Sequence, residues 1–277
     1  MKRRFTQVDV FTHTALLGNP LAVVHDARGL DDAQMQRLAG WTNLSETTFL
    51  LPPSQPGADY RVRIFTKERE LPFAGHPTLG SCHAWLEAGG QARHAEVIVQ
   101  ECAVGLVRIR REQQRLAFAA PPCLRTGPLE PALVARIAAA LGLAPHAVID
   151  HQWVDNGPGW CALRLASAAA VLAVQPDWAA LAGLKLGLVG AHPAGGDAQF
   201  EVRALIGAAP GFEDPVTGSL NASLAQWLIG SGVAPSRYVA TQGARLGRCG
   251  RVHVAREGET VWIGGVSLSC IRGELDL

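Results

Sequence analysis

Two segments of the chain place small residues at the start of an expected helix, a local structure suited to binding an anion. The first reads AGHPTLGSCHAWL and contains Gly75 and His76, and the second reads TGSLNASLAQWL and contains Gly218 and Ser219. The first N–H groups of a helix have no intrahelical acceptor and carry a partial positive charge. A carboxylate is therefore a ligand that such turns can bind.

Three side chains of the chain's motifs could do acid-base chemistry, and two of them, His76 and Asp214, lie in or beside these turns. Glu46 lies in SETTFLL, where residues 49–51 are expected to surround it with apolar groups. Such surroundings raise the pKa of a carboxyl toward the value needed to remove a carbon-bound proton. Without further context, Glu46 is more typical of a solvated strand residue, and His76 of a structural hydrogen-bonding group. Asp214, which precedes a proline, is typical of a turn, and Ser219 of a helix cap.

Composition excludes several classes of function. The chain has 277 residues and a net charge of +1, with 25 basic and 24 acidic residues interspersed, which argues against a nucleic-acid partner. No run of apolar residues is long enough to span a membrane, and the start MKRRFTQVDVF passes directly into a strand pattern rather than a signal peptide. The six cysteines show no C-x-x-C pair and no metal-ligand spacing, so we expect reduced thiols, a cytoplasmic location and no bound metal.

Hydrophobic periodicity predicts a strand-rich chain with a few helices and two domains. A segment rich in proline and glycine, CLRTGPLEP, separates them, so we place the N-terminal domain at 1–122 and the C-terminal domain at 123–277, leaving open whether the last strand returns to the first domain. The expected helices begin near Asp31 or Asp32, His76, Pro131 and Ser219, with short helices near 177–184. The expected strands are 5–11, 20–26, 45–51, 60–66, 96–101, 105–112, 115–121, 147–154, 160–166, 200–206, 237–242, 251–257, 260–266 and 268–277.

The motifs resemble those of the PhzF family, the phenazine-biosynthesis isomerases and their relatives. The resemblance is carried by NLSETTFL, ELPFAGHPTLG and EDPVTGSLNASLAQWL, and extends to VDVFTHTALLGNPLAVV and TQGARLGRCGRVHV. It implies an α+β fold similar to diaminopimelate epimerase. In that fold two pseudo-symmetric domains each wrap a curved sheet around a central helix, and the site lies in the cleft between them.

The resemblance also implies roles for individual residues. Glu46 matches the family's acid/base glutamate, which moves a proton from one ring carbon to another. The substrate-binding positions that match are Gly75, His76, Thr78, Asp214, Gly218 and Ser219. Asn221 is a further candidate to point into the site. No metal or organic cofactor is implied, the partner is a small carboxylate substrate, and the resemblance favours a homodimer.

Several alternatives remain open at this point. Diaminopimelate epimerase uses one cysteine at each of the two helix starts, whereas these turns read GHPT and VTGS, so a two-thiol racemase is disfavoured. We predict a cofactor-independent isomerase that acts on a substrate like trans-2,3-dihydro-3-hydroxyanthranilate. An epimerase or dehydratase of a small hydroxy or amino acid, and a non-catalytic metabolite-binding protein, are the alternatives.

Overall fold

The chain divides into two units, each with its own sheet. The computed structural model describes residues 1–277, with the side chain of Pro145 left out. The N-terminal unit comprises Met1–Ala119 and Gly264–Leu277, and the C-terminal unit comprises Ala120–Ile263. The boundary that the sequence suggested after residue 122 lies close to the end of the first segment. No helix in the described part of the chain is long and apolar enough to cross a membrane.

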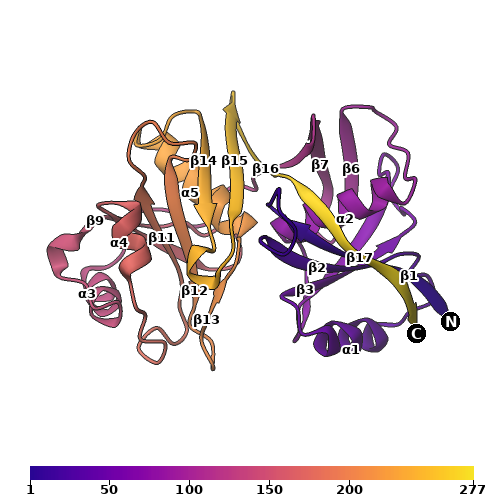
Figure 1. Cartoon of the computed structure of the whole chain (residues 1–277), viewed down its shortest axis with the longest axis horizontal. Coiled ribbons are helices and arrows are strands. Elements are labelled where there is room, and N and C mark those ends of the chain that lie inside the picture. The colour runs from indigo at the N-terminus through magenta and orange to yellow at the C-terminus, as the bar shows by residue number, and fades with distance from the viewer. The chain divides into compact units, whose positions relative to one another are not determined.

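The N-terminal unit is a curved sheet around one long helix (Figure 1). Its helices are α1 (Asp32–Thr42) and α2 (Gly75–Glu87). Its strands are β1 (Lys2–Val10), β2 (Asn19–Val24), β3 (Glu46–Leu51), β4 (Tyr60–Phe65), β5 (Glu70–Leu71), β6 (Val97–Cys102), β7 (Gly105–Glu112), β8 (Arg115–Ala119) and β17 (Ser267–Asp276). The pairing order is β17, β1, β2, β3, β4, β6, β7, β8, with β5 also on β4, and the pairs β2–β3 and β4–β6 are parallel.

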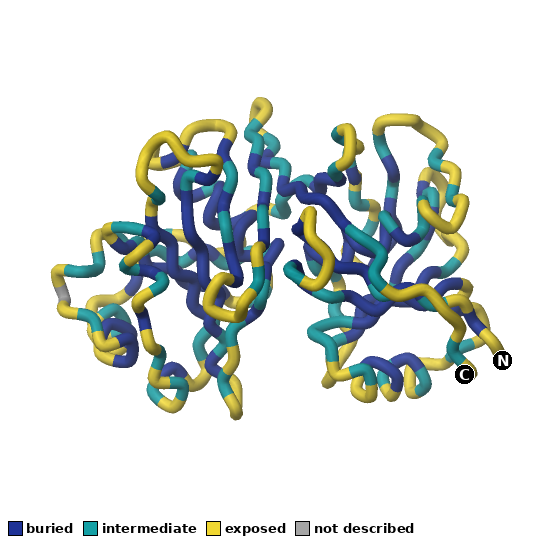
Figure 2. The backbone as a smooth tube through the Cα atoms, viewed as in Figure 1, coloured by how far each residue is buried: buried dark blue, intermediate teal, exposed yellow. Residues whose placement is uncertain are grey.

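Helix α2 is the centre of this unit. It packs against β1, β2, β3, β6, β8 and β17, and residues along its length are buried (Figure 2). Gly80 allows the close approach, because a Cβ added there would lie 2.6 Å from Leu21 Cδ2 and 2.9 Å from Val10 Cγ2. Helix α1 covers the other face of the sheet, where Met35 and Leu38 pack with Phe49.

The C-terminal unit repeats the same plan. Its helices are α3 (Pro131–Ala140), η1 (Pro145–Ala147), α4 (Ala168–Ala173), α5 (Gly218–Gly230) and η2 (Ala244–Leu246). Its strands are β9 (Val148–Trp153), β10 (Trp160–Leu165), β11 (Lys185–Ala191), β12 (Phe200–Ile206), β13 (Phe212–Asp214), β14 (Arg237–Gln242) and β15 (Gly250–Glu257), while β16 (Thr260–Gly265) runs across the boundary between the units. The pairs β10–β11 and β12–β14 are parallel, and β9–β10, β11–β12, β12–β13 and β14–β15 are antiparallel.

The order of elements confirms the predicted pseudo-symmetry. In the N-terminal unit, β4 and β5 lead into α2 and then into β6, which pairs in parallel with β4. In the C-terminal unit, β12 and β13 lead into α5 and then into β14, which pairs in parallel with β12. The α+β fold with one central helix in each unit is therefore as expected.

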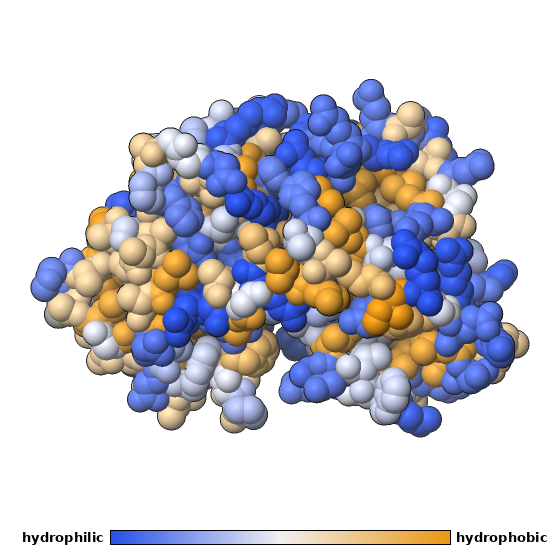
Figure 3. All heavy atoms as spheres, viewed as in Figure 1, coloured by the Kyte–Doolittle hydropathy of each residue, from blue (hydrophilic) through white to orange (hydrophobic). Residues whose placement is uncertain are grey.

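The first and last strands of the chain are partners. β17 pairs with β1 over its length, from Lys2 opposite Asp276 to Val10 opposite Ser267, and the two chain ends lie together in Figure 1. On the face seen in Figure 3, apolar side chains gather over the N-terminal unit around β17. Leu16 and Ile271 are among the exposed large apolar residues of this unit.

The prediction of a short helix near 177–184 was wrong. These residues form turns, and the short helix of this region is α4, which lies before them. Asp177 uses its carboxylate to accept from the N–H groups of Ala179 and Ala180, and Gly183 has a left-handed φ of 81°. A helix that began at Asp177 would have only a few residues before Gly183 ended it. A segment of that length is too short for a stable helix.

Candidate functional site

Glu46 lies beside His76 in the N-terminal unit. It is the first residue of β3, and its side chain is 15% exposed. His76 is the second residue of α2 and is 5% exposed. The Oε2 atom of Glu46 lies 3.3 Å from Nε2 of His76, within the range of an ion-pair contact. The structure thus brings together two of the side chains on which the sequence prediction rested.

Burial keeps His76 neutral. Loss of hydration lowers the pKa of its imidazole to about 3, so the ring carries one proton at neutral pH. Nδ1 lies 3.4 Å from Nδ2 of Asn19, an amide nitrogen that only donates. With Nδ1 as the acceptor, the ring proton lies on Nε2, the atom nearest Glu46, and in the described part of the chain this Nε2 makes no hydrogen bond.

Asn19 is a residue that the sequence reading missed. The sequence places Asn19 just before an expected strand, and the structure shows it completely buried at the start of β2 and in contact with His76. Gly18 precedes it because a Cβ there would lie 2.3 Å from the carbonyl oxygen of Val10. The carboxylate of Asp9 accepts from the N–H of Gly18 at 3.0 Å. These contacts fix the position of Asn19.

The apolar surroundings expected for Glu46 are not formed by its sequence neighbours. Side chains alternate along a strand, so Phe49 and Leu51 lie on the opposite face of β3, in the cluster that packs against α1. Thr48 shares the face of Glu46, and its hydroxyl accepts from Ser81 of α2 at 2.8 Å. The position of Glu46 near α2 therefore depends on tertiary packing and not on the flanking sequence.

Thr78 is buried in the first turn of α2, two residues after His76. Its N–H donates to the carbonyl of Ala74 at 3.1 Å, and its hydroxyl accepts from Nε2 of Gln100 at 3.0 Å. Gln100 in turn accepts from the hydroxyl of Tyr60 at 2.8 Å. The described contacts of Thr78 hold the start of the helix, and a contact with substrate stays a prediction.

The second cluster lies at the start of α5. Asp214 ends β13 and is 8% exposed, and its Oδ2 atom accepts from the hydroxyl of Thr217. Gln242 lies at the centre of the network. Its Oε1 accepts from the N–H of Thr217 at 3.0 Å, and its Nε2 donates to the Thr217 hydroxyl at 2.9 Å and to the Asp214 carbonyl at 3.1 Å. Gly218 and Ser219 then begin the helix.

The described contacts of Asn221 hold the turn before α5, and the expectation that it points into the site stays a prediction. Asn221 is 1% exposed and donates to the carbonyl of Thr217 and to Oε1 of Gln242, both at 2.9 Å. It is therefore part of the support for the turn. Gln242 was missed because it lies on a strand distant in sequence, where a lone glutamine gives no signal.

The starts of α2 and α5 differ from those of α1 and α4. Asp31 caps α1 and Ser167 caps α4 through side-chain acceptors, whereas neither Ala74 nor Thr217 makes such a bond in the described part of the chain. Neither site helix carries an acidic residue in its first turn. Both positive helix ends can therefore interact with an external anion.

Thiol chemistry is not supported at the start of α2. Cys82 is fully buried inside the helix, and burial raises the pKa of its thiol to about 12. The six cysteines are unbridged. Within the described residues, no group of three or more His, Cys, Asp and Glu side chains is placed to hold a metal ion.

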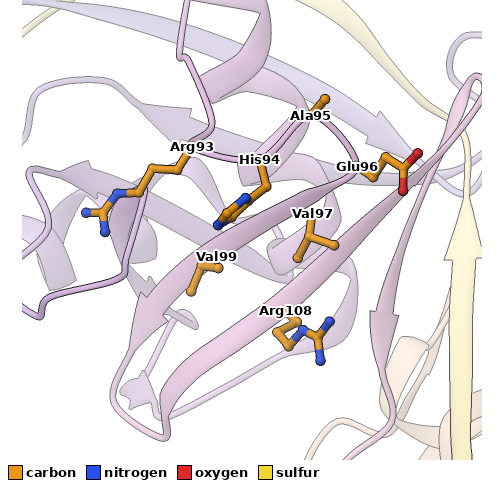
Figure 4. Close-up of a pocket in the computed structure, with 7 residues that line it drawn as sticks. All are labelled: Arg93, His94, Ala95, Glu96, Val97, Val99 and Arg108. Carbon is orange, nitrogen blue, oxygen red and sulfur yellow. The ribbon is translucent and has the colours of Figure 1, made fainter.

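A surface groove of about 740 Å³ lies elsewhere in the N-terminal unit (Figure 4). Its lining residues are Arg93, His94, Ala95, Glu96, Val97, Val99 and Arg108. Figure 4 shows the charged ends of Arg93 and Glu96 directed to opposite sides, and Arg93 already donates to the carbonyl of Ala58 at 2.8 Å. None of the predicted site residues lines this groove.

The fold and the Glu46–His76 pair define a class: an α+β protein of two similar units with a carboxyl and an imidazole beside a helix start. A family model described as phenazine biosynthesis-like protein, PhzC-PhzF, matches residues 8–273. The chain therefore belongs to the PhzC-PhzF family.

Individual relatives agree with this assignment. The chain is 34% identical over 272 residues to the trans-2,3-dihydro-3-hydroxyanthranilate isomerase of Pseudomonas aeruginosa, covering 96% of this chain and 95% of that protein. It is 36% identical over 274 residues to an uncharacterized isomerase of Mesorhizobium japonicum, covering 91% and 90%. A PhzF-family crystal structure from Enterococcus faecalis superposes with a TM-score of 0.83 at 25% identity and covers 100% of both chains. By class the chain is an isomerase.

Proposed function

We propose that the protein is a cofactor-independent isomerase that moves a proton between two carbon atoms of a small carboxylate substrate, with Glu46 as acid and base. The observation that carries the proposal is the contact between Glu46 and the neutral His76 at 3.3 Å. A substrate resembling trans-2,3-dihydro-3-hydroxyanthranilate is supported by the relative of that name at 34% identity.

The proposed step conserves atoms and electrons. The Glu46 carboxylate removes a proton from a substrate carbon, and the C–H electron pair enters the adjacent unsaturated system. The resulting carboxylic acid returns the proton to another carbon of the same system. A neutral His76 suits this cycle, because it lies beside the Glu46 carboxyl without bringing a positive charge next to it.

The remaining predicted residues bind the substrate in this proposal. Gly75 and Gly218 begin helices whose N–H groups suit a carboxylate, and Ser219 adds a hydroxyl donor. Asp214 accepts from Thr217 through one oxygen and is proposed to receive a polar hydrogen of the substrate. Thr78 supports the start of α2.

The test is proton exchange followed by NMR in deuterium oxide with trans-2,3-dihydro-3-hydroxyanthranilate. The wild-type protein is expected to form an isomer in which only one proton and the double bonds have moved, and to incorporate deuterium at the new C–H position. Glu46→Gln is expected to lower the rate of this reaction by at least about 100-fold. Glu68→Gln, a change of the same kind on an exposed residue, is the matched control and should leave the rate unaltered.

The products separate the other functions. Inversion at one carbon with unchanged connectivity indicates an epimerase, and loss of water indicates a dehydratase. Binding without exchange indicates a metabolite-binding protein. Exchange that persists in Glu46→Gln refutes the role of Glu46.

We also propose a homodimer, on the basis of the family resemblance. Size-exclusion chromatography with light scattering measures the mass directly. A value twice the chain mass of 29.4 kDa supports the proposal, and a value equal to it refutes the proposal.

A further inference from the structure

A loop of the C-terminal unit reaches the start of α5. It joins β9 to β10 and reads DNGPG, residues 155–159. One carboxylate oxygen of Asp155 accepts from the N–H groups of Gly157 at 2.8 Å and Gly159 at 2.6 Å. Both glycines have left-handed φ values, 127° and 94°, so the conformation depends on glycine at both positions.

Two hydrogen bonds connect this region to Ser219. The amide of Asn156 donates to the Ser219 carbonyl at 2.9 Å, and the indole Nε1–H of Trp160 donates to the Ser219 hydroxyl oxygen at 3.0 Å. Trp160 is 3% exposed, whereas Ser219 is half-buried.

The bond from Trp160 determines what Ser219 can offer a ligand. An indole nitrogen only donates, so Ser219 accepts from it, and the single hydroxyl proton is left to donate in another direction. Ser223 provides a contrast in the same helix, since its hydroxyl donates to the carbonyls of Ser219 and Leu220 at 3.3 and 3.1 Å. Within the described residues, the Ser219 hydroxyl makes no such bond to a carbonyl.

We infer that Trp160 is a positioning residue that makes Ser219 a hydrogen-bond donor to the substrate, so that the start of α5 selects a carboxylate or carbonyl oxygen over an ammonium group. The neighbouring groups fit this role, because the first N–H groups of α5 are also donors. The inference rests on the proposed function, since it assumes that Ser219 contacts the substrate.

The experiment compares two probes that differ in one group, 3-hydroxyanthranilate and 2-aminophenol, which lacks the carboxylate. Isothermal titration calorimetry gives Kd for the wild type, Trp160→Phe, Ser219→Ala and the double variant. Trp160→Phe should weaken 3-hydroxyanthranilate by about tenfold, as expected for one poorly oriented hydrogen bond to a charged group, and leave 2-aminophenol nearly unchanged. The double variant should bind as Ser219→Ala does, because the effect of Trp160 passes through Ser219.

A matched control and a spectroscopic signature separate positioning from a structural role. Trp153→Phe removes an indole N–H that is buried without a hydrogen bond in the described structure, so both probes should bind as to the wild type. In a ¹H–¹⁵N spectrum, the Trp160 indole N–H should shift downfield on addition of 3-hydroxyanthranilate, since a hydroxyl that donates becomes a better acceptor. Ser219→Ala should abolish this shift.

The outcomes discriminate between the two levels of the hypothesis. If Trp160→Phe weakens the binding of both probes equally, or of neither, the positioning role of Trp160 is overturned. The proposed function still stands in that case, provided that proton exchange depends on Glu46. If the wild type binds neither probe and shows no exchange, the proposed function fails, and the inference fails with it.

Discussion

The buried, neutral His76 should make the stability of the protein depend on pH in a predictable way. The pKa of His76 is about 3 in the folded protein, compared with 6.5 for the free side chain. Between these values the unfolded chain binds a proton that the folded chain does not. Stability should therefore fall as pH decreases below 6.5, and the full contribution is present above that value.

The size of the effect follows from linkage. One full proton of difference corresponds to about 1.4 kcal/mol per pH unit, and the unfolded imidazole is only half protonated at pH 6.5, so His76 should cost about 2 kcal/mol between pH 6.5 and 4.5. The free energy of unfolding is measured with urea at several pH values for the wild type and His76→Gln. The variant retains a polar side chain of similar length but has no group that titrates there. Its loss of unfolding free energy between pH 6.5 and 4.5 should therefore be smaller than that of the wild type by that amount.

A second histidine checks the reasoning. Burial, with a smaller contribution from Arg4, lowers the pKa of His25 to about 4, so His25→Gln should flatten the same curve over a narrower range. Parallel curves for the wild type and His76→Gln would show that the pKa of His76 is the same in the folded and the unfolded chain. Burial would then not hold the imidazole neutral, and its proposed role beside Glu46 would be wrong.

Three further predictions concern packing, the α5 turn and a buried acid. Gly80→Ala should lower the free energy of unfolding by about 1–3 kcal/mol because its Cβ would contact Leu21, whereas Gly230→Ala, with open space around its Cβ, should be neutral or slightly stabilising in the same melts. Gln242→Leu should destabilise the protein by about 1–3 kcal/mol and weaken carboxylate binding, because it leaves the buried polar groups of Thr217 unsatisfied. An unchanged Kd and melting temperature would contradict the hydrogen-bond network described for the start of α5. Burial raises the pKa of Glu201 to about 7, so its contribution to stability is present at acidic pH and lost as pH rises toward 7. Glu201→Gln should therefore gain stability over the wild type at pH 8 but not at pH 4.5 in urea titrations, and an equal effect at both pH values would refute the raised pKa.

Local patterns in the sequence were sufficient to locate the elements that carry the site. The Gly-His-Pro-Thr motif predicted the start of α2, and the alternation around Glu46 predicted β3. Both signals are local, since they depend on proline near a helix start and on the two-residue period of a strand. The family assignment and the fold follow from the same motifs.

The supporting residues could not be found in this way. Asn19 and Gln242 act through contacts with residues far along the chain, and nothing in their own neighbourhoods distinguishes them from ordinary strand residues. The surroundings of Glu46 were misjudged for a related reason: Phe49 is near in sequence but lies on the other face of the strand. Which face meets α2 depends on the assembled sheet.

The glutamines on β6 and β14 show that the two units share more than their order of elements. Gln100 donates to the hydroxyl of Thr78 in the first turn of α2, and Gln242 donates to the hydroxyl of Thr217 at the cap of α5. Each glutamine lies on the strand that follows the central helix and pairs in parallel with the strand before it. The start of each central helix is thus joined through a threonine hydroxyl to a glutamine of the strand that follows it, 22 residues later in the N-terminal unit and 25 residues later in the C-terminal unit. Loss of either glutamine should therefore loosen the start of its helix without any change in the helix sequence.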